Sequence, residues 1–213
     1  MASIGDLKNC AAEHLANFID PLGPRSFSTY DRQGNPALFE PLDALSPALL
    51  DAPLKRSEVN LMFSGESENP YQQLRATIQY CLAELASATV RSGAPLDFAD
   101  AELEKVDGPW ALVQACYEAS NDTLNIKASK VSKMLHRKQP SFIPIIDSKL
   151  VSYYGLTMRE PSKYWVTLQN DYKENRGFLD ALSKNIRTSE GKPISSLRVA
   201  DIVIWEHTVA CCN

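Results

Sequence analysis

Apolar residues recur every three or four positions along most of this chain, the spacing of one face of an α-helix. Prolines, glycines and small polar residues separate these periodic stretches, as is typical of helix caps and turns. The pattern predicts helices over residues 3–20, 70–90, 97–106, 110–119, 128–138 and 148–154, two more after Pro161, and a last one capped by Ser195 or Ser196. We therefore expect an all-α protein, an orthogonally packed helical bundle, with a single domain over residues 1–213 and possible sub-layers 1–106 and 107–213.

The stretch from Thr123 to Leu150 combines an apolar helix face with a run of cations. A hairpin over Leu124–Lys127 is expected to open a helix over Ala128–Lys138, which Pro140 prevents from continuing. At about 100° per residue, the apolar side chains of this helix form one stripe, and basic side chains cluster on another side. The basic residues of the hairpin and helix are Lys127, Lys130, Lys133, Arg137 and Lys138.

This stretch is positive in an acidic molecule. It carries six lysines and arginines against the single acid Asp147, whereas the whole chain has a formal net charge of −4. A local excess of cations is a candidate site for phosphate or another anion. The alternative is a solvated helix face whose lysines only keep the surface soluble.

An apolar segment and an acid follow the basic helix. Phe142–Ile146 is interrupted by Pro144, so a buried extended segment is predicted there. Asp147 comes next, where a new helix over Ser148–Tyr154 should begin. It is expected to cap that helix, and a carboxylate beside a dry segment could also act as a base or stabilise a developing cation.

These residues resemble two families. The pattern LNIKASKVSKMLHRKQPSFIPIIDSKLVSYYG is similar to the helix-hairpin-helix DNA glycosylases of the endonuclease III type over Leu124 to Gly155. The segments HRKQPSFIPIID (His136 to Asp147) and LRVADIVIW (Leu197 to Trp205) resemble an uncharacterised bacterial family of small helical proteins. The resemblance implies a helix-hairpin-helix glycosylase-like core, Asp147 as the catalytic acid and DNA as a partner.

Two positions depart from the glycosylase pattern. The hairpin glycines, which let backbone amides approach a phosphate, are replaced by Asn125 and Lys127. The lysine nucleophile of the bifunctional enzymes falls at Ser129, so no Schiff-base lysine is predicted.

Cysteine and histidine give no sign of a metal centre. The chain has no C-x-x-C pair, and three histidines, His14, His136 and His207, are isolated in the sequence. We therefore expect no metal and no cofactor. The absence of a signal pattern and of a long apolar run predicts a cytoplasmic protein without a membrane segment.

The last helix is apolar nearly all round, with Arg198 and Asp201 on its one polar strip. These two side chains can pair with each other, or either can reach a buried polar partner on another helix.

Two hypotheses of function remain. The first is a nucleic-acid-binding protein, an enzyme or enzyme relic that could cleave an N-glycosidic bond, in which the five cations hold phosphates. Asp147 would then stabilise the sugar cation of a flipped nucleotide or orient the attacking water. The second is a non-catalytic binding or regulatory module that uses the basic helix for an acidic protein or a nucleotide.

Overall fold

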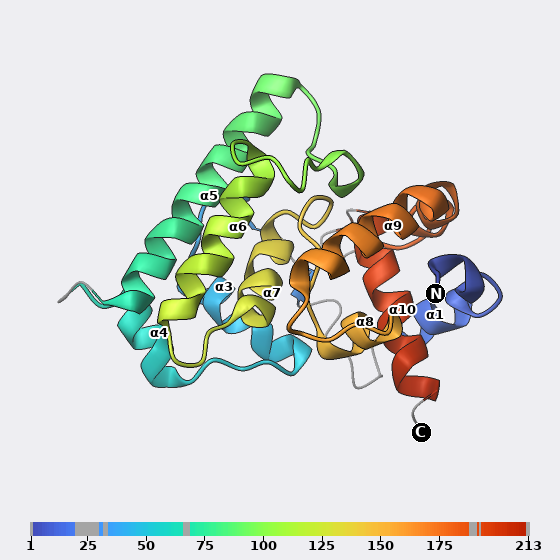
Figure 1. Ribbon diagram of the computed structural model, residues 1–213, viewed down its shortest axis with the longest axis horizontal. Coiled ribbons are helices and arrows are strands. Elements are labelled where there is room, and N and C mark those ends of the chain that lie inside the picture. The colour runs from blue at the N-terminus through green and yellow to red at the C-terminus, as the bar shows by residue number, and fades with distance from the viewer. Residues whose placement is uncertain are drawn as a thin grey trace.

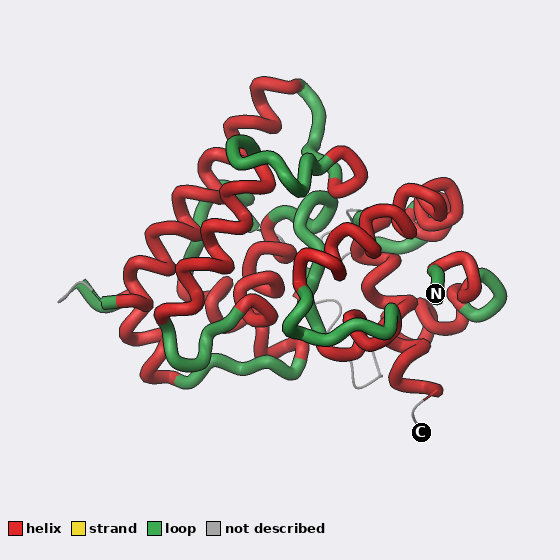
Figure 2. Tube along the Cα trace, viewed as in Figure 1, coloured by secondary structure: helices red, strands yellow, loops and turns green. Residues whose placement is uncertain are grey.

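The computed structural model describes residues 2–19, 30–31, 34–65, 69–187, 191 and 193–211. Secondary structure in these residues is helical apart from one isolated antiparallel bridge, between Arg187 and Pro193, which confirms the all-α prediction for this part of the chain (Figures 1 and 2). The α-helices are α1 (Ala11–Ile19), α3 (Pro41–Leu45), α4 (Arg56–Phe63), α5 (Pro70–Ser92), α6 (Pro109–Ala119), α7 (Ala128–Lys138), α8 (Ser148–Tyr153), α9 (Pro161–Ser183) and α10 (Ser196–Cys211). Short 3-10 helices are η1 (Ile4–Leu7), η2 (Ser46–Leu50), η3 (Phe98–Asp100) and η4 (Ser120–Asp122).

Helix α7 lies between two groups of helices. Figure 1 shows α4, α5 and α6 on one side of it and α1, α8, α9 and α10 on the other. Helix α5 packs against α4 and α6, whereas α10 packs against α1, α8 and α9. The expected sub-layers, 1–106 and 107–213, therefore contact each other on both sides of α7, through α5 with α6 and through α1 with α10.

The N-terminal segment is tied to α9 by one buried carboxylate. Asp171 accepts hydrogen bonds from the Ile4 backbone N–H (2.8 Å), the Ser3 hydroxyl (2.5 Å) and the Tyr154 hydroxyl (2.8 Å). The helix predicted over residues 3–20 is two elements in the structure, η1, which Ser3 caps, and α1, with a turn between them.

Two other predicted elements differ from the structure. Only η3 forms within 97–106, because Gln169 on α9 donates hydrogen bonds to the carbonyls of Phe98 and Ala101 and holds this backbone as a turn. The two helices expected after Pro161 are one continuous helix, α9. The side chains of Tyr172 and Leu179 are both buried, so the packed face of the helix continues from its first half into its second half.

The stretch around α7 follows the prediction closely. The helix spans Ala128–Lys138, the segment after it is buried from Phe142 to Ile146, and Gly155 ends α8 with a positive φ of 70°. No helix in the described residues has the length and hydropathy that crossing a membrane requires.

Candidate functional site

A pocket lies where η2, α7, the 145–147 segment, α10 and α1 meet. Its volume is about 100 Å³. Apolar side chains form part of its wall, and five charged residues form the rest: Asp51, Lys133, Asp147, Arg198 and Asp201. The pocket is therefore mixed in polarity, with more carboxylates than cations along its lining.

Asp147 reaches the pocket from the start of α8. One carboxylate oxygen, Oδ1, accepts a hydrogen bond from the Lys149 backbone N–H (3.0 Å), which is the predicted helix cap. The other, Oδ2, lies 2.9 Å from the Lys133 ammonium. The side chain is 19% exposed, so the acid faces the pocket without being sealed in.

Lys133 fixes that acid from α7. Its side chain is only 4% exposed, and its Nζ donates to both Asp147 and the backbone carbonyl of Leu50 (2.9 Å) at the end of η2. The hydroxyl of Ser132 accepts a hydrogen bond from the Ile146 backbone N–H (2.9 Å) and so holds the extended segment before Asp147 against α7. The carboxylate is thus oriented by a cation that is itself held on two sides.

Arg198 and Asp201 form the α10 wall. They pair with each other, as one sequence alternative expected, and Arg198 also binds the buried Asp31 through Nε (2.9 Å) and Nη2 (3.2 Å). The second alternative holds in part, because Asp31 is a buried polar partner but lies in a turn and not on another helix. The guanidinium lies over the rings of Phe18 and Tyr30, at 5.1 and 5.0 Å from their centroids. Its charge is balanced by two carboxylates and screened from water by two rings.

Two of the three pocket carboxylates, Asp147 and Asp201, differ in their surroundings. Burial raises the pKa of Asp201 to about 6, the positive charge of Arg198 opposes that rise, and the negative charge of Asp147 adds to it. Asp147 has Lys133 beside it and partial contact with solvent. Asp201 can therefore hold a proton in mildly acidic solution.

The predicted row of surface cations is largely inside the protein. Arg137 and Lys138 both bind the buried Asp43, at 2.5 and 2.9 Å, and Arg137 also donates to the carbonyl of Tyr30 (3.1 Å). Together with Lys133, they are 6% exposed or less. The expectation of a solvent-facing row was wrong for these three residues, because residues 30–31 and 43–50 cover that side of α7, which the periodicity of α7 alone cannot reveal.

The two remaining predicted cations lie at the start of α7. Lys127 is exposed, and its Nζ donates to the carbonyls of Asn121 (2.9 Å) and Thr123 (2.5 Å) at the preceding turn. Lys130 is partly buried, three residues before Lys133 on the same side of the helix. Binding of nucleic acid by any of the five cations stays a prediction.

Sequence reasoning missed Asp31 and Asp43 as partners of buried arginine and lysine. The sequence near Asp43 could have predicted only a capping role, in which Asp43 accepts a hydrogen bond from the Glu40 backbone N–H (2.8 Å) at the start of α3. Its second role depends on a contact with residues 94 and 95 positions away in the sequence, which no spacing rule predicts.

Comparison with known proteins identifies the family but no activity. No curated protein and no solved structure matches the chain. The profile of a family of unknown function (DUF6308) matches residues 11–208, which is most of the chain, and the protein therefore belongs to that family.

Proposed function

We propose that the pocket hydrolyses an N-glycosidic bond in nucleic acid, with Asp147 as the principal catalytic residue. The observation that carries this proposal is the placement of Asp147 at a pocket, oriented by Lys133 and beside the second acid Asp201. The glycosylase-like order of parts in the sequence, a turn, a basic helix, an apolar segment and an acid, supports the same chemistry. We also propose, on the same grounds, that the core is of the helix-hairpin-helix type, with its hairpin at Leu124–Lys127.

The two acids would have different roles. As the bond between the sugar C1′ and the base nitrogen breaks, positive charge develops on the sugar, and the Asp147 carboxylate stabilises it. Water then adds to C1′ and gives its proton to Asp147, while the proton of Asp201 passes to the departing base. The products are the free base and a sugar hydroxyl, so atoms and charge balance without a cofactor.

The charge of the pocket supports a cationic transition state. Three carboxylates line it, Asp51, Asp147 and Asp201, against Lys133 and Arg198. When Asp201 carries the proton that it donates, Asp51 and Asp147 match the two cations in number, so the pocket has no excess positive charge for a phosphate, while the Asp147 carboxylate faces the charge that develops on the sugar. Phosphates of the substrate would therefore be contacted outside the pocket, by Lys127 and Lys130 at the start of α7.

The alternative of a non-catalytic module on the basic helix has less support. An acidic partner would need accessible cations, and Lys133, Arg137 and Lys138 are buried with carboxylate partners in place. Within the hairpin and α7, the accessible lysines are Lys127 and Lys130, at the beginning of the helix.

A substrate-independent probe tests the proposal. An oligonucleotide with a cationic pyrrolidine in place of one sugar mimics the developing charge, and the same oligonucleotide with a neutral tetrahydrofuran is its matched control. We expect the pyrrolidine to bind at least about 10-fold more tightly, which corresponds to about 1.4 kcal/mol. In Asp147→Asn, which can still cap α8, the preference should disappear while the fold remains.

Two results would decide against glycosidic cleavage. Equal affinity of the wild type for both oligonucleotides would remove the cation-stabilising role of Asp147. Salt-dependent binding with no preference and no release of free base from DNA would instead support the non-catalytic module.

A further inference from the structure

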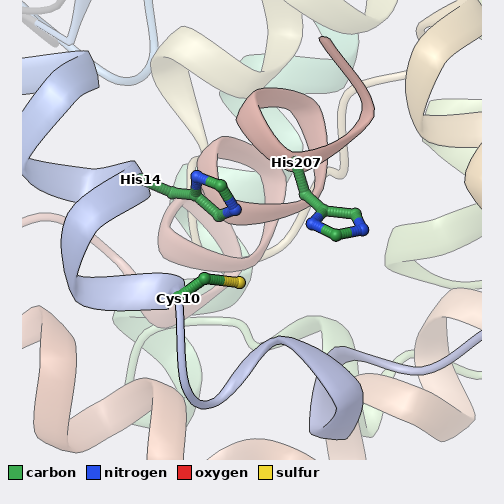
Figure 3. A group of neighbouring side chains, drawn as sticks. All are labelled: Cys10, His14 and His207. Atoms are coloured by element: carbon green, nitrogen blue, oxygen red, sulfur yellow. The ribbon is translucent and has the colours of Figure 1, made fainter. Parts of the chain in front are cut away.

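Three potential metal ligands meet where α1 packs against α10. Cys10 immediately precedes α1, His14 lies one turn later, and His207 lies on α10. Figure 3 shows the three side chains turned toward a common point, and their ligand atoms all lie within 4.8 Å of one another. The histidines that are isolated in the sequence are therefore neighbours in the structure.

The buried ring nitrogen of His14 gives a second, independent indication of a ligand. The side chain is 9% exposed, and its Nε2 atom is buried with no hydrogen-bond partner in the part of the chain that the structure describes. In Figure 3 this edge of the ring faces Cys10 and His207. Buried polar atoms in proteins nearly always have a partner, so the missing partner of Nε2 requires an explanation.

We propose that Cys10, His14 and His207 bind a divalent transition-metal ion of the zinc class. A thiolate and two imidazoles are the ligands that zinc prefers, and three protein ligands leave a fourth tetrahedral position for water. Ligand atoms of a tetrahedral zinc site lie about 3.5 Å apart at usual bond lengths, so small side-chain rotations suffice to close the group. Two carboxylates, Glu13 and Glu206, act electrostatically on His14 and add negative charge around the site.

The ion would fix the position of α1 against α10, and both helices contribute residues to the pocket wall. Phe18 lies one turn after His14 on α1, and Trp205 lies two residues before His207 on α10, and both line the pocket. A metal bound between the two helices would hold these rings in place. This inference is independent of the proposed chemistry, because it needs only the packing of α1 on α10.

Binding of Co²⁺ to metal-free protein tests the site without any assay of activity. We expect one equivalent to give visible d–d bands and a near-ultraviolet thiolate-to-cobalt charge-transfer band. Cys10→Ser should abolish the charge-transfer band, and His207→Asn should weaken binding at least about 10-fold. Cys81→Ser, which removes a buried thiol elsewhere, is the matched control and should leave the spectrum unchanged.

A second variant separates this site from the thiols at the end of the chain. Replacing Cys211 and Cys212 together by serine should preserve the charge-transfer band. Loss of the band in that variant, or its persistence in Cys10→Ser, would overturn the proposal.

Zinc should also stabilise the fold. At a free concentration 100-fold above its Kd, Zn²⁺ is expected to raise the Tm of the wild type by about 5 °C or more, reversibly on chelation, and not that of His207→Asn. An unchanged wild-type Tm together with no cobalt spectrum would refute the site.

Discussion

The ammonium of Lys133 lies 2.9 Å from Asp147 Oδ2, although Lys133 belongs to α7 and Asp147 caps the start of α8. The same Nζ donates to the carbonyl of Leu50, so one nearly buried lysine connects α7, η2 and the start of α8. This contact orients the pocket acid that also caps the start of α8.

Replacement of Lys133 by methionine should separate this orientation from the fold. The apolar stem remains, but Asp147 loses its cation and the Leu50 carbonyl loses its donor, so we expect a loss of about 1–3 kcal/mol in the free energy of unfolding. Base release should fall by about 10- to 100-fold, since Asp147 is no longer held toward the substrate. Urea unfolding and single-turnover assays measure the two effects. Lys163→Met, at an exposed pair with Glu160, is the control and should change neither by much.

Asp43 should be among the residues most sensitive to substitution. Asp43→Asn leaves Arg137 and Lys138 buried without their carboxylate, and we expect the free energy of unfolding to fall by about 3–5 kcal/mol. Glu102→Gln, which breaks an exposed pair with Lys105, should cost less than about 1 kcal/mol. Urea titration of both variants gives the comparison, and equal small losses would mean that the buried cations find water or other partners.

The rate of base release should depend on the protonation of Asp201. Its pKa is raised to about 6 by burial, so the acid carries its proton below that pH and loses it above. If it donates this proton to the leaving base, the single-turnover rate should fall about 10-fold per pH unit above pH 6. Asp201→Asn should be slower and lack this decline. A wild-type rate that is flat from pH 5 to 8 would exclude Asp201 as the donor.

Contact with phosphates should be confined to the start of α7. Lys130→Gln is expected to lower the slope of log affinity for duplex DNA against log salt by about 0.9, because one counterion-releasing contact is lost. Lys105→Gln, at an exposed pair in the loop before α6, should leave the slope unchanged. The same slope in wild type and Lys130→Gln would place the phosphates elsewhere.

Local features of this site could be predicted because they depend on neighbours in the sequence. The limits of α7, the buried segment after it, the cap at Asp147 and the contact of Arg198 with Asp201 all follow from helix periodicity, proline and hydrogen bonds within one turn. Such signals involve residues at most four positions apart, and a single stretch of sequence contains them.

The sequence by itself determined that the chain is helical, where its central helix begins and ends, and that an acid stands at the head of the next helix. The tertiary structure decided which cations reach solvent, which acid neutralises each buried one, and that Cys10 and His14 meet His207. The physical reason is that periodicity defines the faces of a helix but not what covers them. Packing between segments far apart in the chain decides which helix face is covered. A charged side chain is buried only when the same packing places an oppositely charged side chain beside it.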